Sequence, residues 1–185
     1  LLVPCGTTGE SATLSSDEKE ALVRACRAEA AGRALVVAGT GGSDTRVAVA
    51  SACAAADWGA DAVLSLAPRY VKPPQDALIE HFTAVAAACE VPVVVYNVPG
   101  RTGCNLSAET TLALARVPGI AAVKEASADM GQCMRILRDK PPGFAFLGGE
   151  DALLWPFLAL GAEGTISVVG NQAPSELVRL CSAAH

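Results

Sequence analysis

The sequence has few aromatic and few charged residues, and it lacks any long hydrophobic run. Aromatic residues make up 4% of its 185 residues and charged residues 18%, while 51% are hydrophobic, chiefly Ala, Val and Leu. A composition this apolar argues against a disordered chain. No apolar run reaches the ~18 residues of a transmembrane helix. The opening LLVPC is typical of a strand, so we expect no signal peptide and no membrane partner.

Basic clusters, cysteine pairs and histidine ligand groups are also absent. The net charge is −5, which argues against nucleic acid as a partner. His81 and His185 lie far apart, so we expect no metal site. The seven cysteines form no CxxC motif and their number is odd. They fit small core residues of a reducing compartment, so we expect a cytoplasmic protein without disulfides.

Short apolar runs alternate with longer amphipathic segments along the whole chain. Runs that are apolar on both faces predict buried parallel strands, and the segments between them predict helices on the outside of a sheet. The spacing predicts seven βα units. Their strands are expected at residues 1–5, 35–39, 62–66, 92–96, 120–124, 144–148 and 165–169.

The helices between these runs have recognisable ends. Ser15 and Glu18 predict a capping box, and Gly32 predicts the end of the same helix. Similar signals predict further helices from Ser43 or Asp44 to Gly59, and from Ser107 to a point before Pro118.

Two architectures fit this alternation: an open doubly wound sheet and a (β/α)8 TIM barrel. The first βα turn, PCGTTGES, lacks the GxGxxG pattern, and no P-loop follows any strand. Polar side chains gather at the predicted strand ends, as a barrel requires. We therefore predict one partial TIM-barrel domain over residues 1–185. A complete barrel has ~250 residues, so we expect that the first strand and a region after residue 185 are missing.

Lys124 ends the predicted strand IAAVK, where its ammonium group would lose water. A desolvated lysine has a lowered pKa and can act as an amine nucleophile. The alternative is that its head reaches solvent or pairs with Glu125.

Other strand ends supply groups that amine chemistry needs. Tyr96 ends the strand before Lys124 and is suited to relay protons, although it is equally suited to packing against a helix. Thr7 and Thr8 lie between glycines in GTTGES, where hydroxyl and N–H groups are free to bind a carboxylate unless they only form a turn. Arg101 follows Tyr96 and either binds a carboxylate or is a solvated loop charge.

Taken together, an amine, a phenol, two hydroxyls and an arginine suit carbon–carbon bond chemistry on 2-oxo acids. The motifs GTTGES, YNVPGRTG and VKEAS resemble those of the dihydrodipicolinate synthase and N-acetylneuraminate lyase family of class I aldolases, over essentially all 185 residues. Because the lyases of sialic acid lack an arginine at the position of Arg101, the synthases resemble the chain more closely. The resemblance implies condensation of pyruvate with aspartate 4-semialdehyde to 4-hydroxy-tetrahydrodipicolinate, in lysine and diaminopimelate biosynthesis.

The resemblance also implies a role for each residue. Lys124 would form the Schiff base, and Tyr96 would be the proton donor and acceptor. Thr7 would link Tyr96 to Tyr70, which reaches the neighbouring subunit's site across a tight dimer. No organic cofactor is implied. The other residues implied to bind substrate are Thr8 for the pyruvate carboxylate, Arg101 for the semialdehyde carboxylate, and Gly149 and Ile166 through their backbone.

The resemblance further implies a homo-oligomer, usually a tetramer built as a dimer of dimers. The chain departs from lysine-inhibited members at Val47, Arg69, Ser16 and Lys19, where those members carry a glutamate, an aromatic residue and two histidines. We therefore predict weak or absent feedback inhibition by lysine. Two other functions stay open: another pyruvate-dependent aldolase or lyase, acting on a sugar acid, N-acetylneuraminate or 4-hydroxy-2-oxoglutarate, and a catalytically silent barrel that binds a carboxylate.

Overall fold

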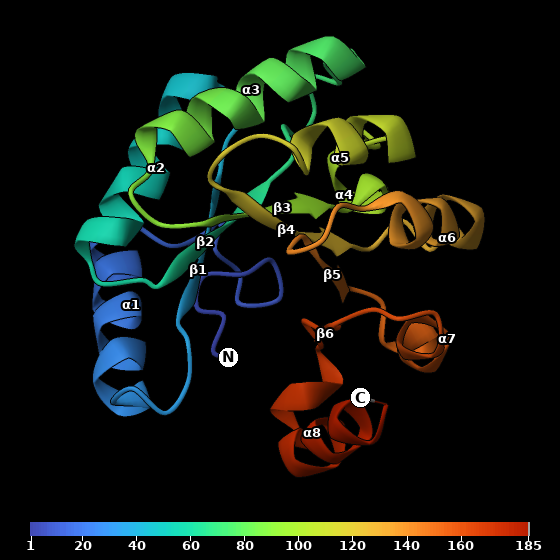
Figure 1. The fold of residues 1–185 in the computed structure, drawn as a ribbon. Coiled ribbons are helices and arrows are strands. Elements are labelled where there is room, and N and C mark those ends of the chain that lie inside the picture. Colours follow the sequence, from blue (N-terminus) through green and yellow to red (C-terminus); the bar gives the residue numbers. More distant parts are fainter. Residues whose placement is uncertain (185) are drawn as a thin grey trace.

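A computed structural model describes residues 1–184 and contains one parallel sheet with its helices on the outside (Figure 1). The sheet pairs its strands in chain order, without a reversal. An open doubly wound sheet would reverse its strand order at a switch point, so the prediction of a βα barrel is confirmed, as an incomplete one. The strands are β1 (Val37–Gly41), β2 (Ala62–Leu66), β3 (Val93–Asn97), β4 (Ile120–Glu125), β5 (Ala145–Gly148) and β6 (Gly164–Thr165).

Helices follow the strands around the outside of the sheet (Figure 1). In chain order they are α1 (Ser16–Ala30), α2 (Thr45–Asp57), α3 (Gln75–Ala88), α4 (Pro99–Thr102), α5 (Ala108–Leu114), α6 (Met130–Asp139), the 3-10 helix η1 (Asp151–Leu153), α7 (Leu154–Ala159), the 3-10 helix η2 (Val169–Asn171) and α8 (Pro174–Ala183). None of these helices is long and apolar enough to cross a membrane.

The predicted helix starts are confirmed, and the predicted ends are less accurate. Ser15 and Glu18 form the reciprocal capping box of α1, and the side chains of Asp44 and Ser107 cap α2 and α5. The predicted stop at Gly32 is wrong by one residue, because Ala31 already adopts the left-handed conformation with φ 46°. Likewise α2 ends at Asp57 rather than Gly59.

The first and last predicted strands are wrong for most of their length. Residues 1–5 form only one bridge, between Leu2 and Val36, although the carbonyls of Leu2 and Pro4 accept hydrogen bonds from the N–H groups of Val37 and Gly39. A regular strand does not form, because Pro4 has no N–H to donate and Cys5 turns the chain away with φ 58°. At the other edge the strand ends at Thr165 instead of residue 169. There the carboxylate of Asp151 accepts hydrogen bonds from the N–H groups of Val168 and Val169, and the chain enters η2.

The apolar residues form two layers, one on each face of the strands. The larger layer packs between the sheet and the helices and includes Val95 and Val123. The smaller layer fills the barrel interior and includes Val94, Tyr96 and Ala122. Since successive side chains of a strand point to opposite faces, this assignment places Lys124 on the interior face and Glu125 on the helix face.

Candidate active site

The site is built on two neighbouring strands, β3 and β4. Their pairing sets Tyr96 opposite Lys124 and Asn97 opposite Glu125. The Nζ of Lys124 lies 4.3 Å from the centroid of the Tyr96 ring. Lys124 and Glu125 leave the strand on opposite faces, so the alternative of a Lys124–Glu125 pair is wrong.

The surroundings of Lys124 increase the fraction of the side chain that is a neutral amine. Burial lowers the pKa of Lys124 to about 8, with the charge of Arg101 adding to the decrease and that of Asp151 opposing it. The Lys124 side chain packs closely against Gly149, because a Cβ added to Gly149 would lie 3.1 Å from the Lys124 Cε. With a pKa of about 8, roughly a tenth of the lysine is the free amine at pH 7.

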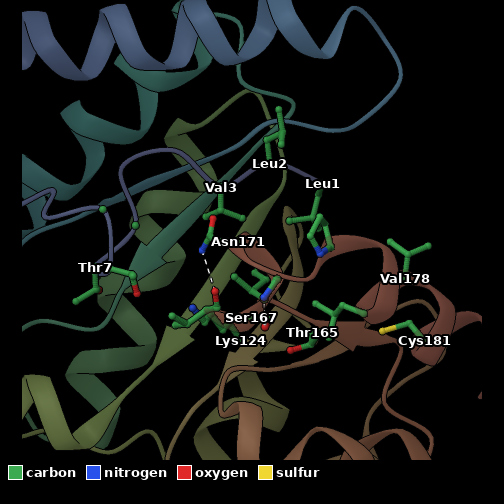
Figure 2. A pocket seen from close by; sticks show the side chains of 18 of the residues that line it. Leu1, Leu2, Val3, Thr7, Lys124, Thr165, Ser167, Asn171, Val178 and Cys181 are labelled. Atoms are coloured by element: carbon green, nitrogen blue, oxygen red, sulfur yellow. Dashed lines mark hydrogen bonds between the residues drawn. The ribbon is translucent and has the colours of Figure 1, made fainter.

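A cavity of about 700 Å³ opens onto Lys124. Figure 2 shows Thr7 on one side of the lysine, with Thr165 and Cys181 on the other. Thr8 and Ile166 line the same cavity, and Gly149 packs against the lysine itself. The structure therefore brings Lys124 together with five of the residues that the sequence analysis selected, namely Tyr96, Thr7, Thr8, Gly149 and Ile166. Thr7, Thr8 and Lys124 thus line one cavity, which is large enough for a small organic acid.

Tyr96 is buried at the level of the lysine. Burial raises the pKa of the Tyr96 phenol, while the charge of Arg101 and a hydrogen bond with the Thr7 side chain lower it. The phenol therefore has Thr7 beside it and Lys124 over its ring. A phenol so close to the amine is a candidate proton carrier.

Two of the selected residues lie at the surface of the described chain. Arg101 is on α4 and exposed, and it reaches Lys124 and Tyr96 only through its charge. Tyr70 is 90% exposed and lines neither the cavity at Lys124 nor its neighbour. Its N–H is held by the Thr102 carbonyl at 3.0 Å, and its φ of 74° is a strained value for a tyrosine.

Sequence reasoning missed a buried polar network behind the lysine. Glu125 is fully buried, and its carboxylate accepts hydrogen bonds from Asn97 Nδ2 at 3.0 and 3.1 Å, Ser127 N at 2.7 Å and Gln132 Nε2 at 3.1 Å. Burial raises the pKa of Glu125, whereas these hydrogen bonds lower it. The pairing of β3 with β4 shifts between Val93 and Val94. The link between Asn97 and Glu125 therefore fixes the register downstream of the shift, where Tyr96 faces Lys124.

Asp151 is a second residue that the sequence analysis did not select. One carboxylate oxygen accepts from Val168 N at 3.0 Å and Val169 N at 2.9 Å, and the other is buried without a partner. Its negative charge raises the pKa of Lys124. Asp151 thus ties the loop after β6 to the loop after β5 and contributes to the field at the amine.

A second cavity, of about 480 Å³, lies next to the first and shares Thr7 with it. All four positions at which the chain departs from lysine-inhibited members line it, namely Ser16, Lys19, Val47 and Arg69. No carboxylate belongs to this lining within residues 1–184.

All seven cysteines are free in the structure. Residues 1–184 contain no group of three or more His, Cys, Asp or Glu side chains that could hold a metal ion. His81 is a buried residue of α3, with its Nδ1 2.9 Å from Thr45 Oγ1, and His185 lies outside the described residues.

In this incomplete parallel βα barrel, a desolvated lysine lies beside a buried tyrosine, an arrangement in which the amine can act as a nucleophile toward a carbonyl group. The chain belongs to the dihydrodipicolinate synthetase family, whose sequence profile matches residues 1–185. It is 51% identical over 181 residues to the 4-hydroxy-tetrahydrodipicolinate synthase of Prosthecochloris aestuarii. The aligned region covers 97% of this chain and 61% of that protein.

Solved structures agree with this assignment. The dihydrodipicolinate synthase of Aquifex aeolicus is 42% identical, with a TM-score of 0.94 over 98% of this chain and 62% of that one. The chloride-inhibited enzyme of Acinetobacter baumannii, solved with pyruvate, is 40% identical, with a TM-score of 0.96 over the same shares. The chain thus spans about three fifths of the length of these relatives.

Proposed function

We propose that this chain is part of a 4-hydroxy-tetrahydrodipicolinate synthase, a lyase that condenses pyruvate with aspartate 4-semialdehyde on the route to diaminopimelate and lysine. The observation that carries the proposal is the Lys124 Nζ held 4.3 Å from the Tyr96 ring centroid, with the lysine pKa lowered to about 8. The family assignment supports the same reaction. We further propose that residues 1–185 belong to one barrel domain.

The proposed reaction begins with the free amine of Lys124. Nζ attacks the carbonyl carbon of pyruvate and forms a carbinolamine, which loses water to give a protonated Schiff base. This cation withdraws electrons from the adjacent methyl group, which gives up a proton and becomes an enamine. The enamine carbon then attacks the aldehyde carbon of the second substrate. Because the lysine itself accepts the electrons, the reaction needs no organic cofactor.

Tyr96 is the proposed carrier of the protons that these steps release and consume. It lies against the amine and has the Thr7 hydroxyl beside it. We propose that Tyr70 completes this relay in the neighbouring subunit of a tight dimer, because its exposed ring and strained backbone direct it away from its own cavity. The site would then be complete only in a homo-oligomer, expected to be a dimer of dimers.

We propose that different residues bind the carboxylates of the two substrates. Thr7 and Thr8 lie beside the lysine and would bind the carboxylate of pyruvate, with the backbone at Gly149 and Ile166 completing the pocket. Arg101, on α4 directly after β3, would receive the carboxylate of the semialdehyde. The seven free cysteines fit a cytoplasmic enzyme.

The test is an assay of the full-length protein with pyruvate and aspartate 4-semialdehyde. Wild type should form product, and Lys124→Ala should not. Arg101→Ala should raise the KM for the semialdehyde about tenfold or more, with little change in the KM for pyruvate. The control Arg33→Ala removes an exposed arginine that pairs with Glu29 on α1 and should leave both KM values unchanged. Turnover only with a sugar acid or a hydroxy-oxo acid would replace the synthase proposal with a lyase.

A further inference from the structure

Helices α2 and α3 lie side by side on the outside of the sheet (Figure 1). They contact each other at matched positions. Thr45 Oγ1 lies 2.9 Å from His81 Nδ1, a separation of 36 residues along the chain. Two turns further on, the contacts of Cys53 with Ala88 and of Cys89 with Ala52 span 35 and 37 residues. The two helices therefore run parallel to each other with a nearly constant offset of about 36 residues. This offset makes Cys53 and Cys89 direct neighbours.

The two thiols point toward each other's backbone. Cys53 Sγ lies 3.3 Å from the Ala88 carbonyl oxygen, and Cys89 Sγ lies 3.8 Å from the Ala52 carbonyl oxygen. Each sulfur thus contacts the residue immediately before the other cysteine. Both side chains are half-buried and free, so small oxidants have access to them.

We propose that Cys53 and Cys89 are a redox pair that closes a reversible disulfide between α2 and α3. The other described cysteines are less suited to this chemistry. Cys181 lines the cavity at Lys124, and within residues 1–184 no second cysteine belongs to that lining. Cys104 and Cys133 are buried in the core, and burial with the nearby charge of Glu125 raises the pKa of Cys133 to about 12. Cys5 is also buried, which leaves its neighbour Cys26 without an equally accessible partner.

A peroxide is the proposed oxidant. The Cys53 thiolate attacks one peroxide oxygen, the O–O bond breaks, and Cys53 becomes a sulfenic acid while water is released. The Cys89 thiolate then attacks the Cys53 sulfur, the S–S bond forms, and hydroxide leaves and takes up a proton as a second water. Two thiols and one hydrogen peroxide give one disulfide and two waters. Burial raises the pKa of Cys89, with the Cys53 and Glu90 charges adding to the effect, so the second step should be faster above neutral pH.

The bond would join the carboxyl-terminal ends of two helices. In a βα barrel these ends lie near the amino ends of the strands, whereas Lys124 lies near the carboxyl end of β4. The disulfide would therefore leave the active-site face in place and restrain α2, α3 and the intervening β2 against unfolding. In a reducing compartment such a bond forms transiently, under oxidative stress.

The test treats the folded full-length protein with hydrogen peroxide at pH 8, blocks free thiols and maps tryptic peptides without reduction. We expect peptide 47–69 joined to peptide 70–101, because these two carry Cys53 and Cys89. The bond should disappear on reduction with dithiothreitol, and oxidation should raise the Tm of wild type. Neither effect should occur in Cys53→Ser or Cys89→Ser, and both should persist in the matched control Cys26→Ser.

Three results would overturn the proposal. These are recovery of both cysteines as free thiols, a Cys5–Cys26 or intermolecular bond in place of the expected one, and accumulation of sulfinic acid at Cys53 without a link to Cys89. Because the peptides are mapped on folded wild type, the conclusion does not depend on whether either serine variant folds.

Discussion

Lys124 should make the folded protein less stable at neutral pH, and Lys124→Met should remove this effect. The pKa of Lys124 falls from its ordinary value of 10.5 to about 8 on folding, chiefly because burial disfavours the ammonium form. Between these two values the unfolded chain binds more protons than the folded one, so the free energy of unfolding rises with pH across this range. Below pH 8 the wild type carries the full penalty.

The size of the effect follows from the difference between the two pKa values. One pKa unit is worth ~1.4 kcal/mol, so the penalty at pH 7 is about 3.3 kcal/mol. At pH 9.5 most folded chains are already neutral at Lys124, and the penalty falls to about 1.4 kcal/mol. Lys124→Met should therefore be more stable than wild type at pH 7, and its advantage should shrink by about 2 kcal/mol at pH 9.5.

The assay is urea unfolding of the full-length protein at both pH values, followed by the fluorescence of Trp58 and Trp155. The matched control is Lys72→Met, at an exposed lysine, which should change stability by less than ~0.5 kcal/mol. A stability difference between Lys124→Met and wild type that stays constant from pH 7 to pH 9.5 would refute the reasoning. It would mean that Lys124 is not desolvated.

Three further predictions concern neighbouring groups. Tyr96→Phe keeps the ring against Lys124 but removes the proton carrier, so kcat should fall by ~10²-fold or more while a Schiff base can still be trapped; an unchanged kcat would contradict this role. Glu125→Gln replaces one carboxylate oxygen with an NH2 group, which would face the N–H donors of Asn97, Ser127 and Gln132. Urea unfolding should show that the free energy of unfolding falls by about 3 kcal/mol. Unchanged stability would show that the network is dispensable. Lysine at millimolar concentration should not inhibit, because Val47 and Arg69 offer its ammonium no carboxylate, and inhibition of wild type would show the opposite.

The strands, the helix starts and the pair of Tyr96 and Lys124 could be predicted from the sequence, because they follow from local patterns. Apolar runs located β1 to β5 within two residues, and side-chain caps such as Ser15 located the helix starts. The alternation of βα units implied that the ends of β3 and β4 share one edge. Tyr96 and Lys124 could therefore be placed together before their register was known.

The remainder depended on contacts that no local pattern reports. The orientation of Glu125 follows from the register of β4 against β3, and the sequence placed it next to Lys124 without showing that it faces away. Strand lengths at the two edges were overestimated, because an apolar run such as TISVV becomes a strand only where a neighbour pairs with it. In TISVV, the N–H groups of Val168 and Val169 donate hydrogen bonds to the Asp151 carboxylate instead of to a neighbouring strand.

The most direct test of the account is borohydride reduction of the full-length protein in the presence of pyruvate, followed by peptide mass mapping. The account predicts a stable adduct on Lys124 and on no other lysine. Its yield should increase through a pH midpoint near the lysine pKa of about 8. A folded, full-length protein that gives no adduct, or gives one on Lys19 or Lys72 instead, would contradict the assignment of Lys124 as the reacting amine.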